Sequence, residues 1–322
     1  MPAYGVDRYI SFALDSVLAQ TFTSYEIIVV NDGCPRTKEL ERVLAPYRER
    51  VIYIKQQNQG ASAARNTAIR EARGRYLALL DPDDYWEPEY LSVQVGVLET
   101  QPAIDVLYPN ARLIGDTFNA GKTYMDLSPS KGEVTFETLI TEQCQVPIFV
   151  TARTEVVKQA GMFDESIRIS QDFDLWIRIV KQGGRITYTR QVLVNRRRRP
   201  EGLSSNEVAL CRDILIIFDK VARTFSLTPS ESGVLKHERA KRQAMLELCQ
   251  GKEAFLKGNA KTAINHLVAA NAFLKSRKIA LVLAGLRTAP RFLLRCHRMR
   301  ERLRWMGVRD FEAPMMMMSR SG

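Results

Sequence analysis

Three carboxylates stand within four residues at Asp81-Pro82-Asp83-Asp84. They follow the apolar run 76–80, which is typical of a buried strand. Open α/β sheets bind ligands beyond the carboxyl ends of their strands. Carboxylates this close repel one another unless a cation lies among them, and hard oxygen ligands suit Mg²⁺ or Mn²⁺. The segment therefore predicts a divalent cation that bridges a diphosphate; the alternative is an acidic turn that caps the next helix.

Two further segments stand at the ends of expected strands. Asp32 follows the apolar run 25–30 and can accept hydrogen bonds from a base or a ribose, although Asn-Asp-Gly is also a common turn. Residues 58–66 start a helix with small residues and place Arg65 one turn inside it. Helix N-termini favour anions, and Arg pairs with phosphates or carboxylates. Ala-rich packing against a sheet is the alternative for this segment.

Asp172 begins a helix whose apolar face carries Leu175, Trp176 and Ile179. An acidic residue in a first turn is often only a partner of the helix dipole. In a cleft that faces a metal, the same carboxylate could take a proton from an acceptor hydroxyl. All three histidines follow residue 236, so chemistry in the first two hundred residues has to rely on carboxylates.

The elements that would position these residues alternate between apolar strands and amphipathic helices. This alternation predicts a mostly parallel sheet covered on both faces, in a Rossmann-like α/β domain. We expect that domain over residues 1–204, a basic helical region over 205–310, and a disordered end over 311–322. The expected helices are 8–20, 37–48, 60–72, 88–98, 154–160 and 170–181, and the expected strands are 25–30, 51–54, 76–80, 104–108, 147–152, 185–189 and 192–196.

The net charge of +11 is carried by the second region, which holds 22 Lys and Arg against 10 Asp and Glu from residue 205 onward. Residues 287–309 set eight arginines among large apolar side chains, as interfacial helices do, so we expect this stretch to contact an anionic membrane surface. A solvated or intramolecular face is the alternative. Five scattered cysteines without a CxxC pair favour a reducing compartment, and no run approaches the roughly 20 apolar residues of a spanning helix. These features favour a cytoplasmic protein, peripheral on the inner face of the membrane.

Taken together, the motifs resemble those of the family 2 glycosyltransferases. The family pattern is matched in order by Pro2-Ala3-Tyr4, Asn31-Asp32-Gly33, the segment 58–66, the segment 81–84, the Gly-x-Phe-Asp-Glu lead at 161–165, and Gln171-Asp172. The resemblance covers residues 1–204. It implies a GT-A type fold and the transfer of a single sugar, with inversion, from a nucleotide-diphosphate sugar to an acceptor hydroxyl.

The resemblance also implies roles for individual residues. Pro2, Ala3 and Tyr4 would position the nucleoside, which Asp32 would contact. Arg65 would lie on the nucleotide side and Asp81 near the ribose. Asp83 would ligate Mg²⁺ or Mn²⁺ at the diphosphate, and Asp172 would be the catalytic base. A UDP-sugar is the expected donor, and a glycan or lipid-linked acceptor in cell-surface polysaccharide or glycoconjugate assembly is the expected partner.

Four departures from the family pattern matter. Asn31 and Gln171 replace acidic residues, while Arg199 takes the position of a histidine, where it could hold a diphosphate but could not ligate a metal. The family has four or five apolar residues ahead of the Pro that is Pro2 here. We therefore expect a Val/Ile-rich strand upstream of Met1 in the natural protein, whose start would then be misassigned or truncated.

Other function classes fit the sequence less well. A non-catalytic sugar-nucleotide-binding or scaffold protein is the main alternative, although all the metal and base carboxylates persist. A nucleic-acid-binding protein would leave the acidic segment without a role, so we expect no nucleic acid partner. A nicotinamide dehydrogenase is disfavoured because no GxGxxG segment follows any expected strand.

Overall fold

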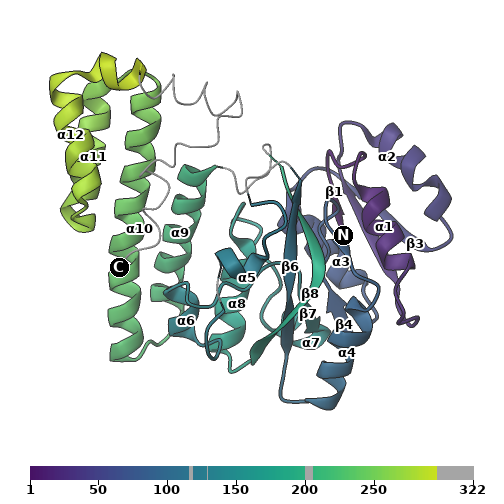
Figure 1. The fold of residues 1–322 in the computed structure, drawn as a ribbon. Coiled ribbons are helices and arrows are strands. Elements are labelled where there is room, and N and C mark those ends of the chain that lie inside the picture. The colour runs from purple at the N-terminus through teal and green to yellow at the C-terminus, as the bar shows by residue number, and fades with distance from the viewer. Residues whose placement is uncertain (116–118, 129, 200–205, 296–322) are drawn as a thin grey trace. The chain divides into compact units, whose positions relative to one another are not determined.

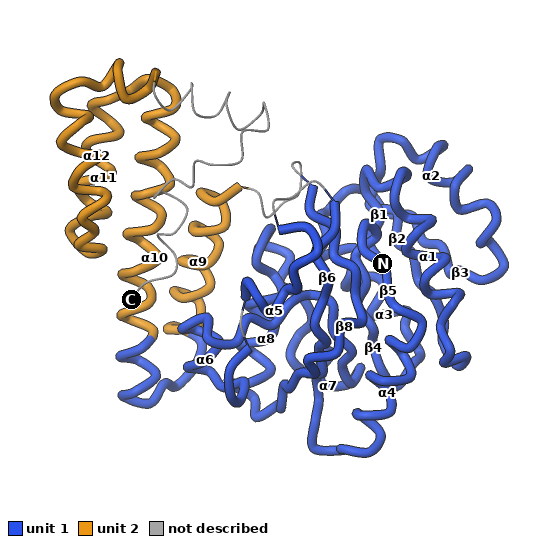
Figure 2. Tube along the Cα trace, in the orientation of Figure 1, with its two compact units in different colours: residues 1–205, 224–234 blue, residues 206–223, 235–322 orange. Residues whose placement is uncertain are grey.

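The computed structural model describes residues 1–115, 119–128, 130–199 and 206–295. The chain divides into two compact units: residues 1–205 with 224–234, and residues 206–223 with 235–322 (Figure 2). The described part of the first unit is an α/β domain, and that of the second is helical (Figure 1). The domain boundary that we expected after residue 204 stays a prediction, and the expected end 311–322 lies outside the described residues.

The first sheet is parallel and has the order β1-β2-β3. β1 is Pro2–Ala3, β2 is Ile27–Asp32 and β3 is Val51–Gln56. Helix α1 (Ile10–Leu18) buries its apolar side, while α2 (Thr37–Leu44) with the 3-10 turn Ala45–Tyr47 connects β2 to β3. Helix α3 (Ala61–Glu71) packs on β1 and β2 through its small residues. The carboxyl ends of β1 and β2 therefore lie side by side, at the edge where the predicted donor residues begin.

The second sheet is mixed and has the order β4-β7-β6-β8-β5. Its strands are β4 (Tyr76–Ala78), β5 (Tyr85–Trp86), β6 (Val106–Gly115), β7 (Thr151–Arg153) and β8 (Ile186–Arg198). Only β6 and β8 pair in parallel. The expected mostly parallel arrangement thus holds for the first sheet, whereas β5 and β7 run antiparallel to their neighbours. The two strands expected at 185–189 and 192–196 are one strand, which contains a register shift opposite Tyr108–Ala111.

Five more helices complete the first domain: α4 (Tyr90–Thr100), α5 (Tyr124–Leu127), α6 (Phe136–Ile140), α7 (Thr154–Gln159) and α8 (Gln171–Lys181). Helix α4 packs against β6, α7 packs against β7, and α8 contacts α6 and α7. Trp176 of α8 is fully buried, together with Leu175 and Ile179. This packing fixes the first turn of α8, which carries Asp172, against the domain core.

A slot of about 370 Å³ lies between the two sheets, because β1 has only two residues and belongs to a different sheet from β4. Tyr25 and Ile28 line one side of it, and residues 76–80 line the other. The Met1 amino group donates to the Ile28 carbonyl at 2.9 Å. Its burial, and then the charge of Arg65, lower its pKa to about 5. Met1 and Pro2 also line this slot.

The second unit is built from α9 (Glu207–Thr224), α10 (Pro229–Leu256), α11 (Ala260–Leu274) and α12 (Arg277–Thr288), although the start of α10 groups with the first unit. Helices α10 and α11 approach closely at Gly251, where an added Cβ would lie 2.9 Å from Leu267 Cγ. No helix in the described ranges has the length and apolar character needed to span a bilayer. Of the basic stretch 287–309, residues 296–309 lie outside those ranges.

Candidate active site

A cleft of about 580 Å³ opens beyond the carboxyl ends of β1 and β2, and the starts of α3 and α8 and the end of β8 also line it. Eight of the nine predicted site residues line this cleft: Pro2, Tyr4, Asp32, Arg65, Asp81, Asp83, Asp172 and Arg199. Ala3 does not, because its side chain is completely buried beneath the sheet edge. The fold thus gathers residues that are separated by up to 197 positions in the sequence.

Asp32 connects the end of β2 to the start of α3 through hydrogen bonds. Its carboxylate accepts hydrogen bonds from the backbone N–H groups of Gln59 (3.0 Å) and Gly60 (2.8 Å), and from Gln56 Nε2 (2.8 Å). A carboxylate has about four acceptor sites, so three internal bonds leave room for a ligand group. Gly33 permits this approach, because its φ of +64° is left-handed and a Cβ there would lie 2.7 Å from the Asn58 nitrogen.

Asn31 replaces the first acidic residue of the family pattern, and it holds the strand end together. Its amide nitrogen donates to Thr37 Oγ1 and to the Tyr53 hydroxyl, while its oxygen accepts from the Cys34 N–H. A carboxylate could not donate these two bonds. Asn31 is therefore a structural residue of this chain, and Asp32 is the carboxylate that faces the cleft.

Arg65 joins the acidic segment to the start of α8. Its Nη2 lies 2.6 Å from Asp81 Oδ1, and its Nη1 lies 2.7 Å from the side-chain amide of Gln171, whose hydrogen bonds are satisfied when the amide oxygen is turned toward Arg65. The guanidinium also stands over the Phe163 ring, 5.5 Å from the centroid. Because Arg65 is only 7% exposed, these contacts fix its head group. Arg65 thus positions Asp81 and the residue before Asp172.

The acidic segment is held by backbone groups, by Arg197 near the end of β8 and by Arg199, which directly follows β8. Asp83 Oδ2 lies 2.7 Å from Arg199 Nε, although that N–H is not aligned for a hydrogen bond. Asp84 accepts from the Arg197 N–H at 2.7 Å. Burial, followed by the charge of Asp81, raises the pKa of Asp83; burial, followed by the charges of Asp83 and Asp81, raises the pKa of Asp84 well above its usual value. The segment therefore carries more negative charge than its neighbours compensate.

Asp172 is half-buried at the first turn of α8. Desolvation raises the pKa of this carboxyl, opposed by the Phe173 N–H bond to Oδ1 (2.9 Å) and then by the charges of Arg65 and Arg196. A base whose pKa is raised toward neutrality is better suited to accept a proton from a hydroxyl. The position and the environment of Asp172 are therefore compatible with general-base chemistry.

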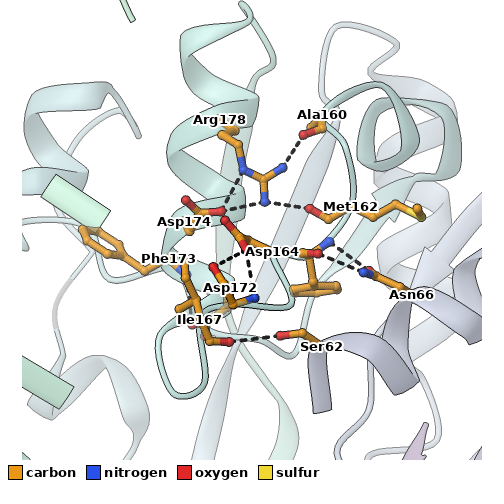
Figure 3. A network of polar contacts seen from close by, with 12 residues as sticks. Ser62, Asn66, Ala160, Met162, Asp164, Ile167, Asp172, Phe173, Asp174 and Arg178 are labelled. Atoms are coloured by element: carbon orange, nitrogen blue, oxygen red, sulfur yellow. Dashed lines mark hydrogen bonds and ion pairs between the residues drawn. The ribbon is translucent and has the colours of Figure 1, made fainter. Parts of the chain in front are cut away.

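A network of polar contacts holds the loop before α8 (Figure 3). Asn66 exchanges two hydrogen bonds with the backbone of Phe163, at 2.8 and 2.9 Å, and Ser62 Oγ donates to the Ile167 carbonyl at 3.3 Å. Arg178 pairs with Asp174 one turn earlier in α8, and donates to the carbonyls of Ala160 and Met162. These contacts tie α3 to the loop that leads into Asp172.

The cleft residues that were not anticipated include three arginines, Arg196, Arg197 and Arg198, which together with Arg199 form a run at the end of β8. The expected strand stopped at residue 196, so Arg197, Arg198 and Arg199 were expected to follow the strand. Four consecutive arginines at a strand end were the signal that could have identified them. In the structure, β8 continues to Arg198 and carries the run into the cleft.

The cleft fits a divalent cation that is held jointly with a nucleotide. No group of three or more carboxylate, thiol or imidazole side chains that could hold a metal exists among the described residues. Mg²⁺ is usually held by one or two carboxylates plus substrate phosphates. Asp83 supplies one such carboxylate, facing the cleft with a raised pKa that a neighbouring cation would lower again. The donor set is thus suited to a cation that arrives with a diphosphate.

The fold and the cleft define the class of the protein as a glycosyltransferase with a GT-A type nucleotide-binding domain. The model of the family described as "Glycosyl transferase family 2" matches residues 1–166. The chain therefore belongs to this family.

Its relatives include proteins that are named as uncharacterized glycosyltransferases. A glycosyltransferase of Rickettsia prowazekii is 29% identical over 204 residues, which cover 61% of this chain and 62% of that protein. One from Methanocaldococcus jannaschii is 30% identical over 178 residues, covering 54% of this chain and 60% of that protein. The chain spans between 29% and 62% of the length of its Rickettsia relatives.

Solved structures share the fold. TarS of S. aureus, residues 1–349 in complex with UDP, superposes with a TM-score of 0.60 at 15% identity, covering 85% of this chain and 90% of that one. The mannosyltransferase PcManGT of Pyrobaculum calidifontis, in complex with GDP-Man and Mn²⁺, gives a TM-score of 0.58 at 18% identity, with coverages of 91% and 81%. At these identities the likeness establishes the fold alone.

Proposed function

We propose that this family 2 enzyme transfers one sugar from a nucleotide-diphosphate sugar, a UDP-sugar, to an acceptor hydroxyl with inversion of the anomeric carbon. The observation that carries the proposal is the convergence of Asp172, Arg65 and the segment 81–84 in one cleft. Solved neighbours bound to UDP, UDP-GlcNAc and GDP-Man support the nucleotide-sugar donor. Membership of the family supports the reaction class.

The proposed roles are those that the family resemblance implies, and the contacts support them. Asp32 has a free acceptor site for the nucleoside, beside Pro2 and Tyr4. Asp81 faces the ribose, while Arg65 holds the other side of the Asp81 carboxylate. Asp83 holds Mg²⁺ or Mn²⁺, and Arg199, displaced from Asp83, turns to the diphosphate. When bound, the cation neutralises charge that develops on the departing diphosphate.

The proposed chemistry is a single displacement. Asp172 accepts the proton of the acceptor hydroxyl as its oxygen attacks the anomeric carbon from the side opposite the diphosphate. The bond between that carbon and the diphosphate oxygen breaks, and its electron pair leaves with the nucleoside diphosphate. Because attack and departure lie on opposite faces, one displacement inverts the anomeric configuration.

The test is donor binding and turnover with a panel of nucleotide sugars, with and without Mn²⁺. Asp172→Asn should lower kcat by roughly 10²–10⁴-fold with donor affinity nearly unchanged, the scale of general-base loss. Asp83→Asn should remove the Mn²⁺-dependent part of donor affinity. Glu89→Gln, an exposed carboxylate outside the cleft, is the control. Donor binding without turnover in the wild type would favour the sugar-nucleotide-binding or scaffold alternative, and a fully active Asp172→Asn would remove Asp172 from the mechanism.

A second proposal concerns location: the stretch 287–309 attaches a cytoplasmic enzyme to the inner face of the membrane, near a glycan or lipid-linked acceptor used in cell-surface polysaccharide or glycoconjugate assembly. Its eight arginines support this, since each basic residue near an anionic leaflet adds about 1 kcal/mol. Flotation with phosphatidylglycerol vesicles should carry the protein at low salt and release it at high salt. Absence from the floated fraction at low salt would contradict the proposal.

A further inference from the structure

The arginine run at the end of β8 divides into two pairs that face opposite sides of the strand. Residues alternate between the two faces of a strand, so Arg197 and Arg199 share one face and Arg196 and Arg198 share the other. The contacts agree with this alternation. Arg197 and Arg199 both stand over the Tyr9 ring, at 5.2 and 5.3 Å, whereas Arg196 stands over the rings of Tyr124 and Phe149, at 5.3 and 6.0 Å.

The pair on the Tyr9 face already contacts the acidic segment 81–84. Arg199 lies against the Asp83 carboxylate, and Arg197 Nε donates to the Asp83 carbonyl at 3.1 Å. The Arg197 backbone N–H is bonded to Asp84. These contacts assign Arg197 and Arg199 to the acidic segment, which is the nucleotide side of the cleft.

The pair on the other face has no such partner. Among the residues that the structure describes, no carboxylate forms an ion pair with Arg196 or Arg198, although both line the cleft. Desolvation, and then the charge of Arg196, lower the pKa of Arg198, so the two guanidinium groups act on each other as like charges. The charges of Asp84 and Asp172 reach these arginines without forming an ion pair with them, so the two cations still repel each other, and a bound anion would relieve that repulsion.

The position of this pair relates it to the acceptor. The charge of Arg196 acts on Asp172, the proposed base, and the charges of Arg196 and Arg198 both act on Tyr124. Tyr124 is buried, and its hydroxyl donates to the Gln145 carbonyl, so it forms a fixed wall for Arg196. An anion held by Arg196 and Arg198 would therefore lie beside the base, where the acceptor hydroxyl has to be placed.

We propose that Arg196 and Arg198 form a phosphate-binding subsite for the acceptor, so that the enzyme glycosylates a hydroxyl compound carrying a phosphate group close to the reacting oxygen. This rests on the proposed function, and it names the chemical class of the acceptor. The planar, permanently charged guanidinium pairs with phosphate oxygens through two parallel hydrogen bonds, and two such groups side by side favour a phosphate over a neutral sugar.

Calorimetric titration of inorganic phosphate tests the subsite, with the nucleotide side first filled by saturating UDP and Mg²⁺ at constant ionic strength. We expect saturable phosphate binding to the wild type. The double variant Arg196→Gln/Arg198→Gln should bind phosphate at least about tenfold more weakly, the scale of lost charge-assisted bonds, while its UDP affinity stays the same. Arg190→Gln, an exposed arginine of the same strand, is the matched control. Arg198→Gln alone should weaken phosphate binding in the same direction without disturbing the packing of Arg196 on its aromatic wall.

The outcomes separate this inference from the proposed function. If UDP binds and phosphate does not, the subsite is wrong and the donor assignment stands. If the double variant loses UDP affinity instead of phosphate affinity, the arginines belong to the donor diphosphate and the subsite is again wrong. If UDP itself fails to bind, the proposed donor is wrong, and the same phosphate titration without UDP, compared between wild type and double variant, still decides the subsite.

Discussion

Asp84 is the least accessible carboxylate of the acidic segment, being only 4% exposed and bonded to the Arg197 N–H. Burial and two neighbouring carboxylates keep its pKa raised in the folded protein, which therefore binds protons more strongly than the unfolded chain does. Stability is then lost as pH rises above the unfolded value of about 4. In the presence of a metal chelator, Asp84→Asn should raise the midpoint of urea-induced unfolding at pH 7.5. The substitution removes the buried charge, while the amide oxygen can still accept the hydrogen bond from the Arg197 N–H.

The same dependence of stability on the protonation of Asp84 provides a control for that variant. Below about pH 4 Asp84 is protonated in both states, so the difference between variant and wild type should shrink to near zero. Glu89→Gln should leave both midpoints unchanged, since Glu89 is exposed. A lower midpoint for Asp84→Asn at pH 7.5 would show that the carboxylate charge stabilises the fold, contrary to this argument.

The pH dependence of kcat should report the environment of Asp172. Because desolvation raises its pKa, kcat should fall with decreasing pH at a higher pH than an ordinary aspartate would give. The charge of Arg196 opposes that rise in pKa, so Arg196→Gln should move the acidic limb of the pH profile to a still higher pH. Arg190→Gln should not move it. An acidic limb that stays in place in Arg196→Gln would mean that the Arg196 charge does not reach the base.

Much of the residue-level site could be predicted from the sequence, because its motifs follow apolar strands whose carboxyl ends meet at one edge of a sheet. Asp32, Arg65 and Asp172 were placed by that rule, and all three line the cleft. The bridge from Asp81 through Arg65 to Gln171 could not be predicted, since it depends on how α3 and α8 approach each other. The burial of the Ala3 side chain could not be predicted either, because a two-residue strand does not reveal which side chain turns inward.

At the level of elements, the slot between β2 and β4 should accept a further strand. We expect an engineered extension of five alternating Val and Ile residues ahead of Met1 to raise the melting temperature, since it would bury apolar side chains and pair the strand edges. Each net kcal/mol gained should add about 2–4 °C for a domain of this size. The extension also replaces the buried Met1 ammonium by a neutral peptide group, which removes the cost behind its lowered pKa.

A Gly/Ser extension of the same length is the control, because it removes the charge without supplying apolar side chains. It should stabilise the protein less than the Val/Ile extension at every pH. Equal melting temperatures for the two extensions would show that the slot gains nothing from apolar side chains. Whether the natural chain carries such a strand stays a separate prediction.

The sequence anticipated the existence of most elements better than their bounds and pairing. Long periodic segments such as α3 and α8 were placed within one or two residues, because their apolar spacing repeats over several turns. β8 was divided in two because its register shift interrupts the alternation of apolar residues. The antiparallel pairings of β5 and β7 depend on strands of two and three residues, which carry too little periodicity to reveal a direction.

At the scale of the whole molecule, nucleotide and metal should bind as a coupled pair. No ready-made group of three metal-binding side chains exists in the described part of the chain, so the diphosphate has to supply some of the ligands. We expect Mn²⁺ to bind weakly alone and at least about tenfold more tightly with UDP present, with the reciprocal effect of Mn²⁺ on UDP affinity. Paramagnetic resonance of free Mn²⁺ measures the first effect, and calorimetry measures the second.

Asp83→Asn provides the comparison for this coupling. It should abolish the enhancement while leaving UDP binding in chelator close to that of the wild type, because the nucleoside contacts are elsewhere in the cleft. Tight Mn²⁺ binding in the absence of any nucleotide would reveal a metal site that the described side chains do not account for.

Pro2 and Arg65 line both the catalytic cleft and the slot between the sheets, so the wall between these two spaces is a single layer of residues. Pro2 is held in place by a strand of two residues, one side of which faces the slot. Under the proposed roles, a nucleotide bound at Pro2 and Tyr4 has to restrict the motion of a lightly supported segment, and the entropy lost there subtracts from its affinity. Whatever fills the slot would restrict that motion in advance. The strength with which this enzyme holds its donor is then governed in part by a surface that the donor never touches.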